Sequence, residues 1–455
     1  MPIVKRAIAF VVIAVTAWAC GGGTTTSPSA ASSGAAPSTE SCAAPPPPAG
    51  ATDLTFWTFV DRHATFFQSR AEAWNEANPD RPITITPSVV EYTQMHDNLT
   101  AALLSGTGAP DLVDIEIGKF AIYVKGELHL LDMTAEMEPY VADLVETRLA
   151  PYEFDGKRLA ADYHLGAFLA FYNKEILDAA GVDVDTIKTW DDYIEAGKKV
   201  TQDTDGDGTP NTWMAAIDVT GPFAVRGPML QNGGGAYDSG GNLILNSPEN
   251  VEALQMVADM VNVHKIATGT PGGNNGSPEF YAAMPAGEFA SVWMPQWYMT
   301  RFPDNMAALA GKMVVRPMPL FREGGFTTTM GGGTGTAVTD QTPAEEQQLA
   351  KDFVTFAKLT KEGQTAIWTD LGFDPYRNDV YDDPALQQAD EYFSGEVTFE
   401  IIKSELGNVA PEFTGPQYPE IQDYFTTTLI NDIVNNGVSA ADALAAAQAA
   451  IEAQQ

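Results

Sequence analysis

The sequence has few cysteines, few basic residues and few histidines. Its 455 residues include only Cys20 and Cys42, both before the first predicted strand, so no disulfide framework can stabilise the folded part. Lys and Arg number 25 against 60 Asp and Glu, a formal charge of −35, which argues against nucleic acid or an anionic membrane surface as a partner. The five histidines are scattered singly, which leaves little room for a histidine-rich metal centre.

The chain does contain enough apolar residues for a large core. Hydrophobic residues make up 44% and aromatic residues 10% of the sequence, which is typical of a globular protein and not of a disordered acidic tail. The length is sufficient for the hydrophobic cores of two or three domains. The sequence has no HExxH, GxSxG or GxxxxGK[ST] motif and no repeat of solenoid or propeller period.

The N-terminus predicts export from the cytoplasm. Two basic residues precede the apolar run 7–19, which has the length of a signal-peptide core and is too short to span a bilayer. Residues 1–19 are therefore predicted to be a signal peptide. Cys20 directly follows the small residue Ala19 and resembles the lipidated cysteine of bacterial lipoproteins, although the two residues before Ala19 depart from the usual lipobox. An ordinary secretory signal cleaved after Ala19 is the alternative.

Residues 20–51 are predicted to form a flexible tether behind the lipidated cysteine. They are rich in Gly, Ser, Thr, Ala and Pro and carry a single charge, Glu40, so they cannot form a core. A coil of this length reaches on the order of 30 Å, enough to hold a domain clear of a bilayer. Cys42 lies inside the tether without an apolar run before it and is assigned no role. The predicted location is extracytoplasmic, lipid-anchored to the cell membrane at the bacterial surface or in the periplasm.

From residue 53 onward, strand-like and helix-like segments alternate. The predicted order is strand 54–59, helix 63–78, strand 83–90, helix 95–104 and strand 111–117. Such alternation is typical of βαβ units and predicts an α/β fold with mostly parallel sheets covered by helices. Later helices are predicted to start after N-caps at Thr189, Ser247, Thr342 and Ser439.

Six sequence motifs occur in the order typical of one protein family. They are Asp53–Trp57, Gly106–Val113, Phe171–Leu177, Lys188–Tyr193, Gly287–Trp293 and Ala350–Gly363. Together they resemble the family 1 extracellular solute-binding proteins of carbohydrate ABC importers, the class of the maltose-binding protein. The resemblance runs from about residue 52 to the end. The stretches Glu91–His96 and Asp114–Ile117 are similar to those of members that take up arabinose-type sugars and arabino-oligosaccharides.

This resemblance implies a two-lobe, type II periplasmic-binding-protein-like fold with a hinge between two α/β lobes. By analogy, the first lobe is expected at 52–162 plus 312–372 and the second at 163–311 plus 373–455, with a hinge strand near 161–163. The resemblance further implies that a sugar or oligosaccharide bound between the lobes favours the closed form, which the transmembrane subunits of an ABC permease recognise. The protein is expected to be a monomer. It is also expected not to be an enzyme.

Candidate sugar-binding residues follow from the chemistry of sugars and the geometry of α/β sheets. Sugars present CH-rich faces and hydroxyl edges, so their sites combine aromatic planes with polar side chains. Ligands of open α/β sheets bind beyond the carboxyl ends of the strands. The candidates at predicted strand ends, at the crossing between lobes and in a glycine-rich stretch are Trp57, Asp61, His63, Glu116, Tyr163, His164, Trp293, Trp297, Gly332 and Gly333. Among them, Trp297 matches the position where the family commonly supplies a stacking tryptophan.

Each of these candidates also has a purely structural interpretation. A tryptophan at a strand end is buried in the core about as often as it is exposed. A solitary carboxylate such as Glu116 is more often solvated or hydrogen-bonded than bound to a ligand. The glycine-rich stretch is also compatible with a simple turn before a strand.

Residues 203–211 match the first nine positions of an EF-hand calcium loop. The predicted metal ligands are Asp203, Asp205, Asp207, Thr209 and Asn211. Position twelve is Met214 in place of the bidentate Glu, so another residue, such as Asp218, would have to complete the coordination shell. The prediction is a structural Ca²⁺ ion, with no cofactor for catalysis. The alternative is a solvated acidic turn, in which the three carboxylates repel each other.

Two other classes of function compete with the binding protein. A secreted carbohydrate-active enzyme needs two carboxylates at a fixed separation, and no spacing among the 60 acidic residues locates such a pair. A glycan-binding surface lipoprotein would be expected to show repeats or an all-β pattern, and the sequence has neither. The sequence therefore favours the binding component of an ABC importer, with no catalytic residues assigned.

Overall fold

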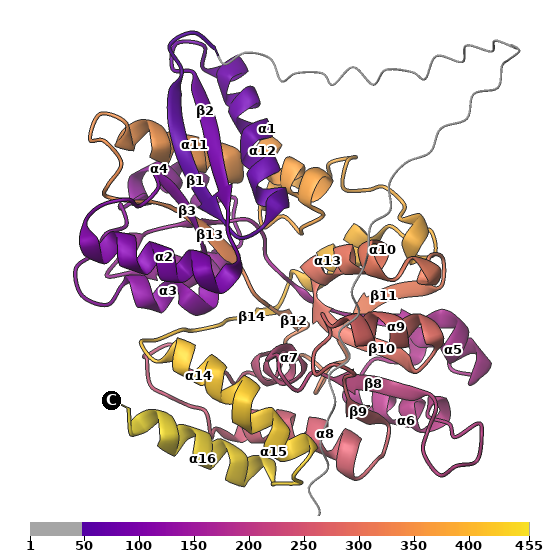
Figure 1. The fold of residues 1–455 in the computed structure, drawn as a ribbon. Coiled ribbons are helices and arrows are strands. Elements are labelled where there is room, and N and C mark those ends of the chain that lie inside the picture. The colour runs from indigo at the N-terminus through magenta and orange to yellow at the C-terminus, as the bar shows by residue number, and fades with distance from the viewer. Residues whose placement is uncertain (1–47, 455) are drawn as a thin grey trace, which may run out of the picture. The chain divides into compact units, whose positions relative to one another are not determined.

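Two five-stranded sheets organise the protein, whose computed structural model describes residues 48–454 (Figure 1). The strand order is β2-β1-β3-β13-β6 in the first sheet and β11-β7-β10-β8-β9 in the second. The predicted signal peptide, Cys20, Cys42 and most of the predicted tether lie outside the described residues. Among residues 48–454, no helix combines the length and the apolar character needed to cross a membrane.

Each sheet has four strands in one direction and a single reversed strand. β1 is parallel to β2 and β3, and the reversed β13 is antiparallel to β3 and β6. In the second sheet β8 is parallel to β9 and β10, and the reversed β7 is antiparallel to β10 and β11. The first sheet comprises β1 (Thr52–Thr58), β2 (Ile83–Val89), β3 (Leu112–Glu116), β6 (Ala161–Asp162) and β13 (Thr334–Val338). The second comprises β7 (Phe168–Asn173), β8 (Trp213–Ile217), β9 (Ala267–Gly269), β10 (Phe289–Pro295) and β11 (Met313–Pro317).

Two short strand pairs, sixteen α-helices and nine short 3₁₀ or π helices complete the regular structure of the described part of the chain. The short pairs are β4 (Glu153–Phe154) with β5 (Lys157–Arg158), and β12 (Thr328–Thr329) with β14 (Val409–Ala410). The helices up to residue 262 are α1 (Asp61–Ala77), α2 (Tyr92–Ser105), α3 (Ile117–Tyr123), α4 (Thr134–Val141), α5 (Lys174–Ala179), α6 (Trp190–Val200), α7 (Phe223–Gln231) and α8 (Pro248–Asn262). The later ones are α9 (Pro278–Ala286), α10 (Arg301–Asn305), α11 (Gln347–Leu359), α12 (Lys361–Ala366), α13 (Thr398–Glu405), α14 (Tyr418–Tyr424), α15 (Ile430–Val434) and α16 (Ala440–Glu452).

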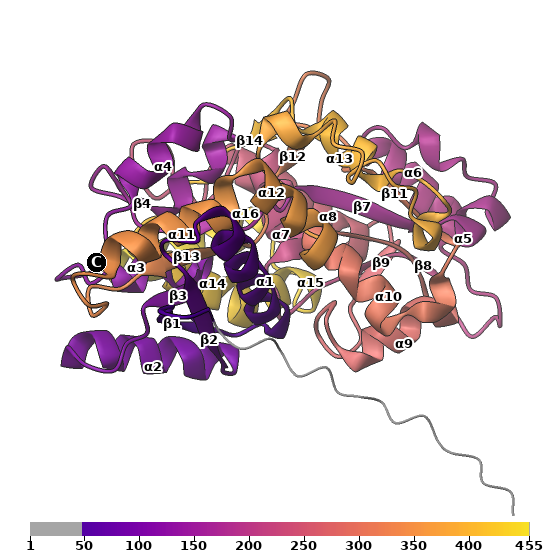
Figure 2. The same cartoon turned by 90° about the horizontal axis from the view of Figure 1, so that it is seen from above.

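Helices cover both faces of the first sheet (Figure 2). On one face, Phe56 of β1 is fully buried against Phe67 of α1, with ring centroids 4.5 Å apart. On the other face, Val113 and Ile115 of β3 cluster with Leu99 of α2. The alternation along the strands thus sends side chains into two apolar layers, which confirms the predicted α/β arrangement.

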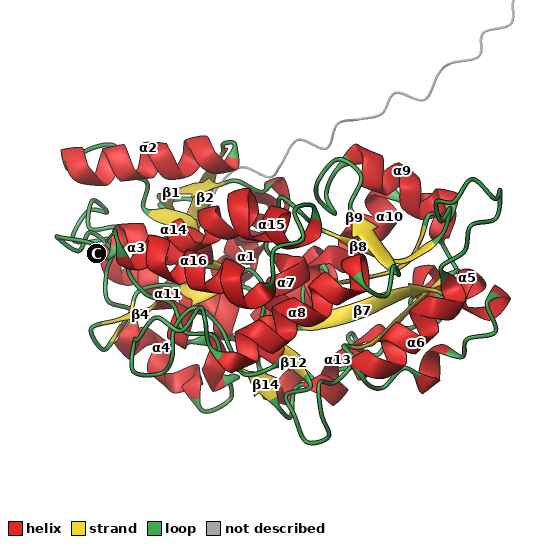
Figure 3. Ribbon diagram, turned by 90° about the horizontal axis from the view of Figure 1, so that it is seen from below, coloured by secondary structure: helices red, strands yellow, loops and turns green. Residues whose placement is uncertain are grey.

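The second sheet is built around strands that are buried along their whole length. All six residues of β7 and all seven of β10 are buried, as expected for central strands that are covered on both faces. Beside this sheet, α8 packs against α7 and α16, as Figure 3 shows from below. The aromatic rings of Trp190 and Trp293 meet edge to face at a centroid distance of 5.2 Å and join α6 to β10.

Three of the four predicted helix caps are confirmed. Thr189 forms a full capping box at the start of α6, and Ser247 and Ser439 each accept a hydrogen bond from the third residue of the helix that follows. The cap predicted at Thr342 is wrong, because its hydroxyl donates to the backbone carbonyl of Asp111 at 3.4 Å and the chain makes a turn before α11 begins.

Two chain segments cross between the sheets side by side, and a third segment is bonded to them. The first runs from β6 to β7 and the second from β11 to β13, and the N–H of Gly331 donates to the carbonyl of Gly166 at 2.8 Å. The buried carboxylate of Asp374 accepts hydrogen bonds from the N–H groups of Gly166 at 2.9 Å and Ala167 at 2.8 Å. The hinge predicted near 161–163 lies at the start of the first crossing.

The structure corrects two of the expected lobe boundaries. The chain does not return to the first lobe at residue 312, because β11 pairs with β7 in the second sheet. It also does not leave that lobe at residue 373, since the Tyr376 hydroxyl donates to the carbonyl of Asp162 at 3.2 Å and its own carbonyl accepts from Val145 N–H at 2.8 Å. Boundaries taken by analogy cannot locate such short connecting segments.

Candidate functional site

A cavity of about 290 Å³, here called the central cavity, lies beyond the carboxyl ends of strands from both sheets. Lining residues lie directly after β1, at the last position of β3 and just after β10, as expected for an α/β binding site. Six of the ten predicted ligand-binding residues line it, namely His63, Glu116, His164, Trp297, Gly332 and Gly333. The other lining residues are Phe59, Val60, Arg62, Phe223, Thr300, Arg301, Asp304, Thr334, Leu371 and Phe373.

His63 is fixed in position by a buried carboxylate. Its Nδ1 lies 2.8 Å from Oδ2 of Asp114, which also accepts from the Thr58 hydroxyl at 2.8 Å. Burial lowers the pKa of His63, whereas the His63 hydrogen bond and nearby Lys358 outweigh the burial of Asp114 and hold the pKa of that carboxyl below its usual value. The imidazole is therefore neutral, with Nδ1–H donated to Asp114 and Nε2 left as an acceptor.

Tyr163 supports His63 from behind and does not line the central cavity. Its ring stacks on the imidazole at a centroid distance of 4.1 Å, and its hydroxyl donates to Asp114 at 3.2 Å. The side chain is fully buried. The expectation of a direct ligand contact is therefore corrected, because the residue next along the crossing, His164, occupies the cavity wall.

Glu116 combines a structural role with a place in the cavity wall. Its carboxylate caps α3 by accepting from Gly118 N–H at 2.7 Å and also accepts from the Tyr92 hydroxyl at 3.2 Å. Its backbone N–H donates to Nε2 of His96 at 3.3 Å, and Nδ1–H of His96 donates to the carbonyl of Tyr92 at 2.8 Å. Burial is the main cause that raises the pKa of Glu116.

Gly332 and Gly333 are required by the protein's own packing. Both have positive φ angles, 71° and 145°, which disfavour residues with a side chain. A Cβ atom at Gly333 would collide with the guanidinium of Arg148, which is fully buried and paired with Asp162. Arg148 also donates to the carbonyl of Gly332 at 2.9 Å. The glycines thus let a buried ion pair approach the backbone directly behind the cavity wall.

The two tryptophans after β10 have different environments. Trp297 is half-buried, lines the central cavity, and is held by a hydrogen bond from Nε1 to the carbonyl of Gly331 at 3.0 Å. Trp293 is 2% exposed, and its Nε1 donates to the carbonyl of Ala224 at 3.1 Å. Trp293 is therefore a core residue, and the prediction of its ligand contact is corrected.

Trp57 and Asp61 also lie outside the lining of the central cavity. Trp57 is half-buried and packs against the apolar cluster between the first sheet and α2. Asp61 is exposed at the first position of α1, where an acidic residue is favoured by the helix dipole. Proximity to a strand end was the only signal for these two residues, and it does not determine the direction of a side chain.

Several residues of the lining were missed by the sequence analysis. Phe223 starts α7, and its ring meets that of Trp297 edge to face at 5.5 Å. Arg62 and Asp304 form an ion pair at 3.1 Å between α1 and α10. Arg301 follows Trp297 by four residues, and among residues 48–454 no carboxylate lies within ion-pair distance of it. The helix after β10 was the available signal, since it begins at a carboxyl end of the second sheet.

Two further cavities adjoin the central one. One, of about 520 Å³ and here called the Asp218 cavity, shares Phe223, Trp297 and Arg301 with the central cavity. The other, of about 410 Å³ and here called the lateral cavity, shares Glu116 and Phe223 with it. Together the three volumes form a series that could hold a ligand longer than one sugar unit.

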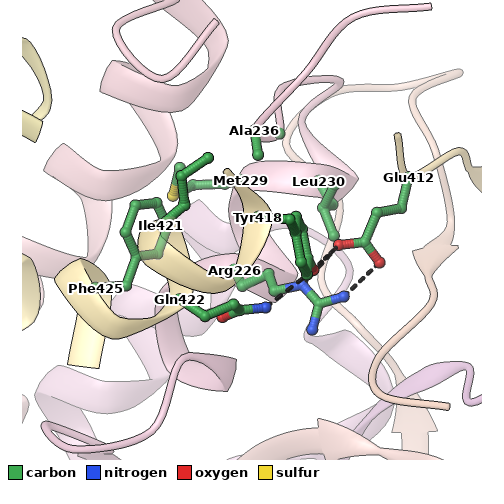
Figure 4. Close-up of a pocket in the computed structure, with 10 residues that line it drawn as sticks. Arg226, Met229, Leu230, Ala236, Glu412, Tyr418, Ile421, Gln422 and Phe425 are labelled. Carbon is green, nitrogen blue, oxygen red and sulfur yellow. Dashed lines mark hydrogen bonds and ion pairs between the residues drawn. The ribbon is translucent and has the colours of Figure 1, made fainter. Parts of the chain in front are cut away.

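A smaller hollow near α14 is unsuited to a sugar. Its volume of about 20 Å³ has room for about one water molecule. Apolar side chains such as Met229 surround it, and Arg226 is paired there with Glu412, which also accepts from the Tyr418 hydroxyl at 2.6 Å (Figure 4). This cluster joins α7 to α14 beside the lateral cavity and stabilises that wall.

The acidic loop before β8 brings three predicted metal ligands together. Carboxylate oxygens of Asp203, Asp205 and Asp207 lie within 4.8 Å of one another, and all three residues are exposed. Asn211 accepts from Thr204 N–H at 2.8 Å through its amide oxygen. Asp218 does not complete this group, because it is buried beyond the opposite end of β8. The proposed calcium shell therefore lacks the completing residue that was suggested for it.

The two sheets, their crossings and the shared cavity define a type II periplasmic-binding-protein fold. The chain belongs to the bacterial extracellular solute-binding protein family, whose profile matches residues 61–364. It is thus a solute-binding protein that acts outside the cytoplasm.

Two curated relatives match over almost their whole length. An arabinooligosaccharide-binding protein of Halalkalibacterium halodurans is 42% identical over 407 residues, which cover 89% of this chain and 90% of that one. A protein of the same name from Bacillus subtilis is 37% identical over 393 residues, covering 85% of this chain and 89% of that one.

Solved structures show the same fold at lower identity. The ABC-transporter-associated binding protein of B. animalis subsp. lactis Bl-04, in complex with beta-1,6-galactobiose, superimposes with a TM-score of 0.68 at 23% identity, covering 88% of this chain and 97% of that one. Maltose-bound MalE3 of T. maritima gives a TM-score of 0.67 at 20% identity, covering 89% of this chain and 100% of that one. These likenesses confirm the fold class.

Proposed function

We propose that this protein captures an arabinose-containing oligosaccharide and delivers it to an ABC permease in the bacterial membrane. The two relatives named for arabino-oligosaccharide binding support this sugar class, because each match spans nearly the whole of both chains. The stretches Glu91–His96 and Asp114–Ile117, which carry the resemblance to this sugar class, meet beside the central cavity, where Tyr92 and His96 contact Glu116.

The observation that carries the proposal is the central cavity itself. One side presents the half-exposed ring of Trp297, a suitable platform for the CH-rich face of a sugar. The other side presents an imidazole acceptor at His63 and the carboxylate of Glu116, both suited to sugar hydroxyls. The adjoining cavities supply room for further sugar units.

Closure of the two lobes around the ligand is the proposed mechanism. A ligand that contacts residues of both sheets stabilises the closed arrangement by its differential affinity for that state. Arg62 and Asp304, which pair at 3.1 Å, would be in contact only when α1 and α10 are close. Lys125 and Glu420 lie 3.5 Å apart and join the end of α3 to α14 in the same manner. The permease then recognises the closed form.

The remaining parts of the proposal concern location, assembly and chemistry. Residues 1–19 direct export, and lipidated Cys20 with the tether 20–51 anchors a monomeric binding domain to the membrane. The protein binds its sugar without cleaving it, in keeping with a family of solute-binding proteins. Prolonged incubation with arabino-oligosaccharides should leave them intact, and sustained release of shorter products would contradict this part.

The loop 203–211 is proposed to hold a structural Ca²⁺ ion. Three carboxylates within 4.8 Å supply hard oxygen ligands, which such an ion prefers. Removal of metal with EDTA should lower the melting temperature, and added Ca²⁺ should restore it, because an ion bound to the native state stabilises it. Asp205→Asn should weaken this response. An unchanged melting temperature after verified metal removal would refute the ion site.

Isothermal titration calorimetry tests the proposed sugar directly. L-Arabinose, arabino-oligosaccharides of increasing length, maltose and galactobiose should be titrated into the protein without its tether. Arabino-oligosaccharides should bind more tightly than the other two disaccharides. Equal or tighter binding of maltose or galactobiose would reject the sugar class and leave the family assignment intact.

A further inference from the structure

The Asp218 cavity carries polar groups that a ligand in the central cavity alone would not use. It lies beyond the carboxyl ends of β8 and β10 in the second sheet, next to the loop before α9. Trp297 and Arg301 line both cavities, so the tryptophan ring stands between them. A ligand stacked on this ring can extend from one cavity into the other.

Asp218 places a buried carboxylate in this cavity with acceptor capacity to spare. It directly follows β8 and is 3% exposed. Its Oδ1 accepts from the N–H groups of Gly221 at 2.6 Å and Thr220 at 3.3 Å. Its Oδ2 has only a long contact of 3.5 Å to Asn275 N–H, although a carboxylate oxygen can accept two hydrogen bonds. This oxygen is available to a hydroxyl group of a ligand.

Donor groups face the same space. The phenol of Tyr281 is half-buried in the lining, and its hydroxyl has no hydrogen-bond partner among residues 48–454. Arg301 has no carboxylate within ion-pair distance in that part of the chain. Asn274 contributes an amide whose Nδ2 reaches the Thr220 hydroxyl only at 3.4 Å. Donors and acceptors therefore both line the cavity.

This mixture suits a ligand with several hydroxyl groups. A hydroxyl group can donate a hydrogen bond to the Asp218 carboxylate and can accept one from the Arg301 guanidinium. Burial raises the pKa of Asp218 to about 6, so the carboxyl group is ionised and accepts hydrogen bonds at neutral pH. A volume of about 520 Å³ is ample for a sugar unit beside the aromatic ring of Trp297.

We propose that the Asp218 cavity is a second sugar subsite, so that a single oligosaccharide runs from Glu116 past Trp297 to Asp218. The inference rests on the proposed function, since it assigns part of that same ligand. It adds that the protein measures chain length: units beyond those in the central cavity gain affinity from Asp218 and Tyr281.

The test is a length series titrated into matched variants by calorimetry. Arabino-oligosaccharides from two to six units are titrated into the wild type, Asp218→Asn and Tyr281→Phe, and into Asp423→Asn as the variant that tests the lateral cavity instead. Wild-type affinity should rise with length and then level off. Asp218→Asn should lower the affinity for the long ligands about tenfold and change the affinity for the shortest ligand by less than about twofold. Tyr281→Phe removes only a hydroxyl group and should also weaken the binding of long ligands. It therefore tests the subsite even if Asp218→Asn folds poorly.

The two levels of the proposal fail in different ways. Losses that are equal at every length, or no loss in either variant, overturn the second subsite while the sugar class stands. If no arabino-oligosaccharide binds the wild type, the proposed function fails and the subsite fails with it. A loss of long-ligand affinity in Asp423→Asn as strong as that in Asp218→Asn would also overturn the inference, because the extra units would then lie in the lateral cavity.

Discussion

The two walls of the central cavity are built on opposite principles. On the first wall, which His63, Glu116 and Gly332 define, the polar groups are already bonded to other protein groups. On the second wall, defined by Trp297 and Arg301, a half-exposed ring and a guanidinium without a carboxylate face the ligand. The contrast teaches that one wall is preorganised by buried charges, whereas the other offers contact surface that only a ligand can complete.

The largest effect should come from breaking the ion pair behind the first wall. Asp162→Ala leaves the buried Arg148 guanidinium without its partner and should lower the free energy of unfolding by about 3–5 kcal/mol. Chemical denaturation measures this loss. The control is Asp352→Ala, which removes a partly exposed partner of Arg81 and should cost below about 1 kcal/mol. Equal losses in both variants would show that the first wall is not held by buried charge.

The next effect concerns His96, which supports Glu116 on the first wall. Burial lowers its pKa to about 4, from an ordinary 6.5 in the unfolded chain. Between these values the unfolded chain binds more protons, so the free energy of unfolding falls as the pH drops from about 6.5 towards 4, by about 3 kcal/mol from this residue. The free energy of unfolding, measured by chemical denaturation at several pH values in this range, should change less with pH in His96→Gln than in the wild type. An equally steep pH dependence in His96→Gln and the wild type would show that His96 does not cause it.

Substitutions in the second wall should change the affinity for the ligand more than the stability of the fold. Trp297→Ala removes the stacking ring and should weaken binding of the arabino-oligosaccharide by about 1–3 kcal/mol. Trp293→Phe, four residues earlier in the core, should lower the melting temperature and leave the affinity nearly unchanged. Titration calorimetry and thermal denaturation of both variants separate the two outcomes. Full affinity in Trp297→Ala would remove this ring from the site.

The smallest effect should come from the ion pair that joins the walls. Arg62 and Asp304 are each about half exposed, so their attraction is screened and contributes about 0–1 kcal/mol. Arg62→Gln should weaken ligand binding less than about fivefold, and the difference from wild type should vanish at high salt. A loss that persists in high salt would mean that Arg62 contacts the ligand itself.

The sequence predicted the α/β fold because local signals agreed with the final packing. The early alternation of strands and helices and three of the four caps lie where the sequence predicts them. The lobe boundaries were less accurate, since the assignment of β11 depends on pairing with a strand far away in the chain. Such pairing leaves no local trace in the sequence.

The candidate site was predicted in part for the same reason. Proximity to a strand end correctly identified His63, Glu116 and Trp297 as cavity residues. The same criterion also selected Trp293, which is buried in the core. The direction of each side chain depends on which face of the sheet is covered by helices. Asp218 shows the converse, because its sequence position suggested a metal ligand and its burial beyond β8 places it in a cavity lining.

The reversed strand β13 has a consequence for biosynthesis. Residues 334–338 lie between β3 and β6, so the first sheet stays open until about three-quarters of the chain has been made. Pairing between such distant segments is slow, because the ends of a long loop must meet before any contact forms. A chain that cannot close its first sheet early remains unfolded for longer during synthesis, the state in which a polypeptide can be threaded through a narrow translocation channel.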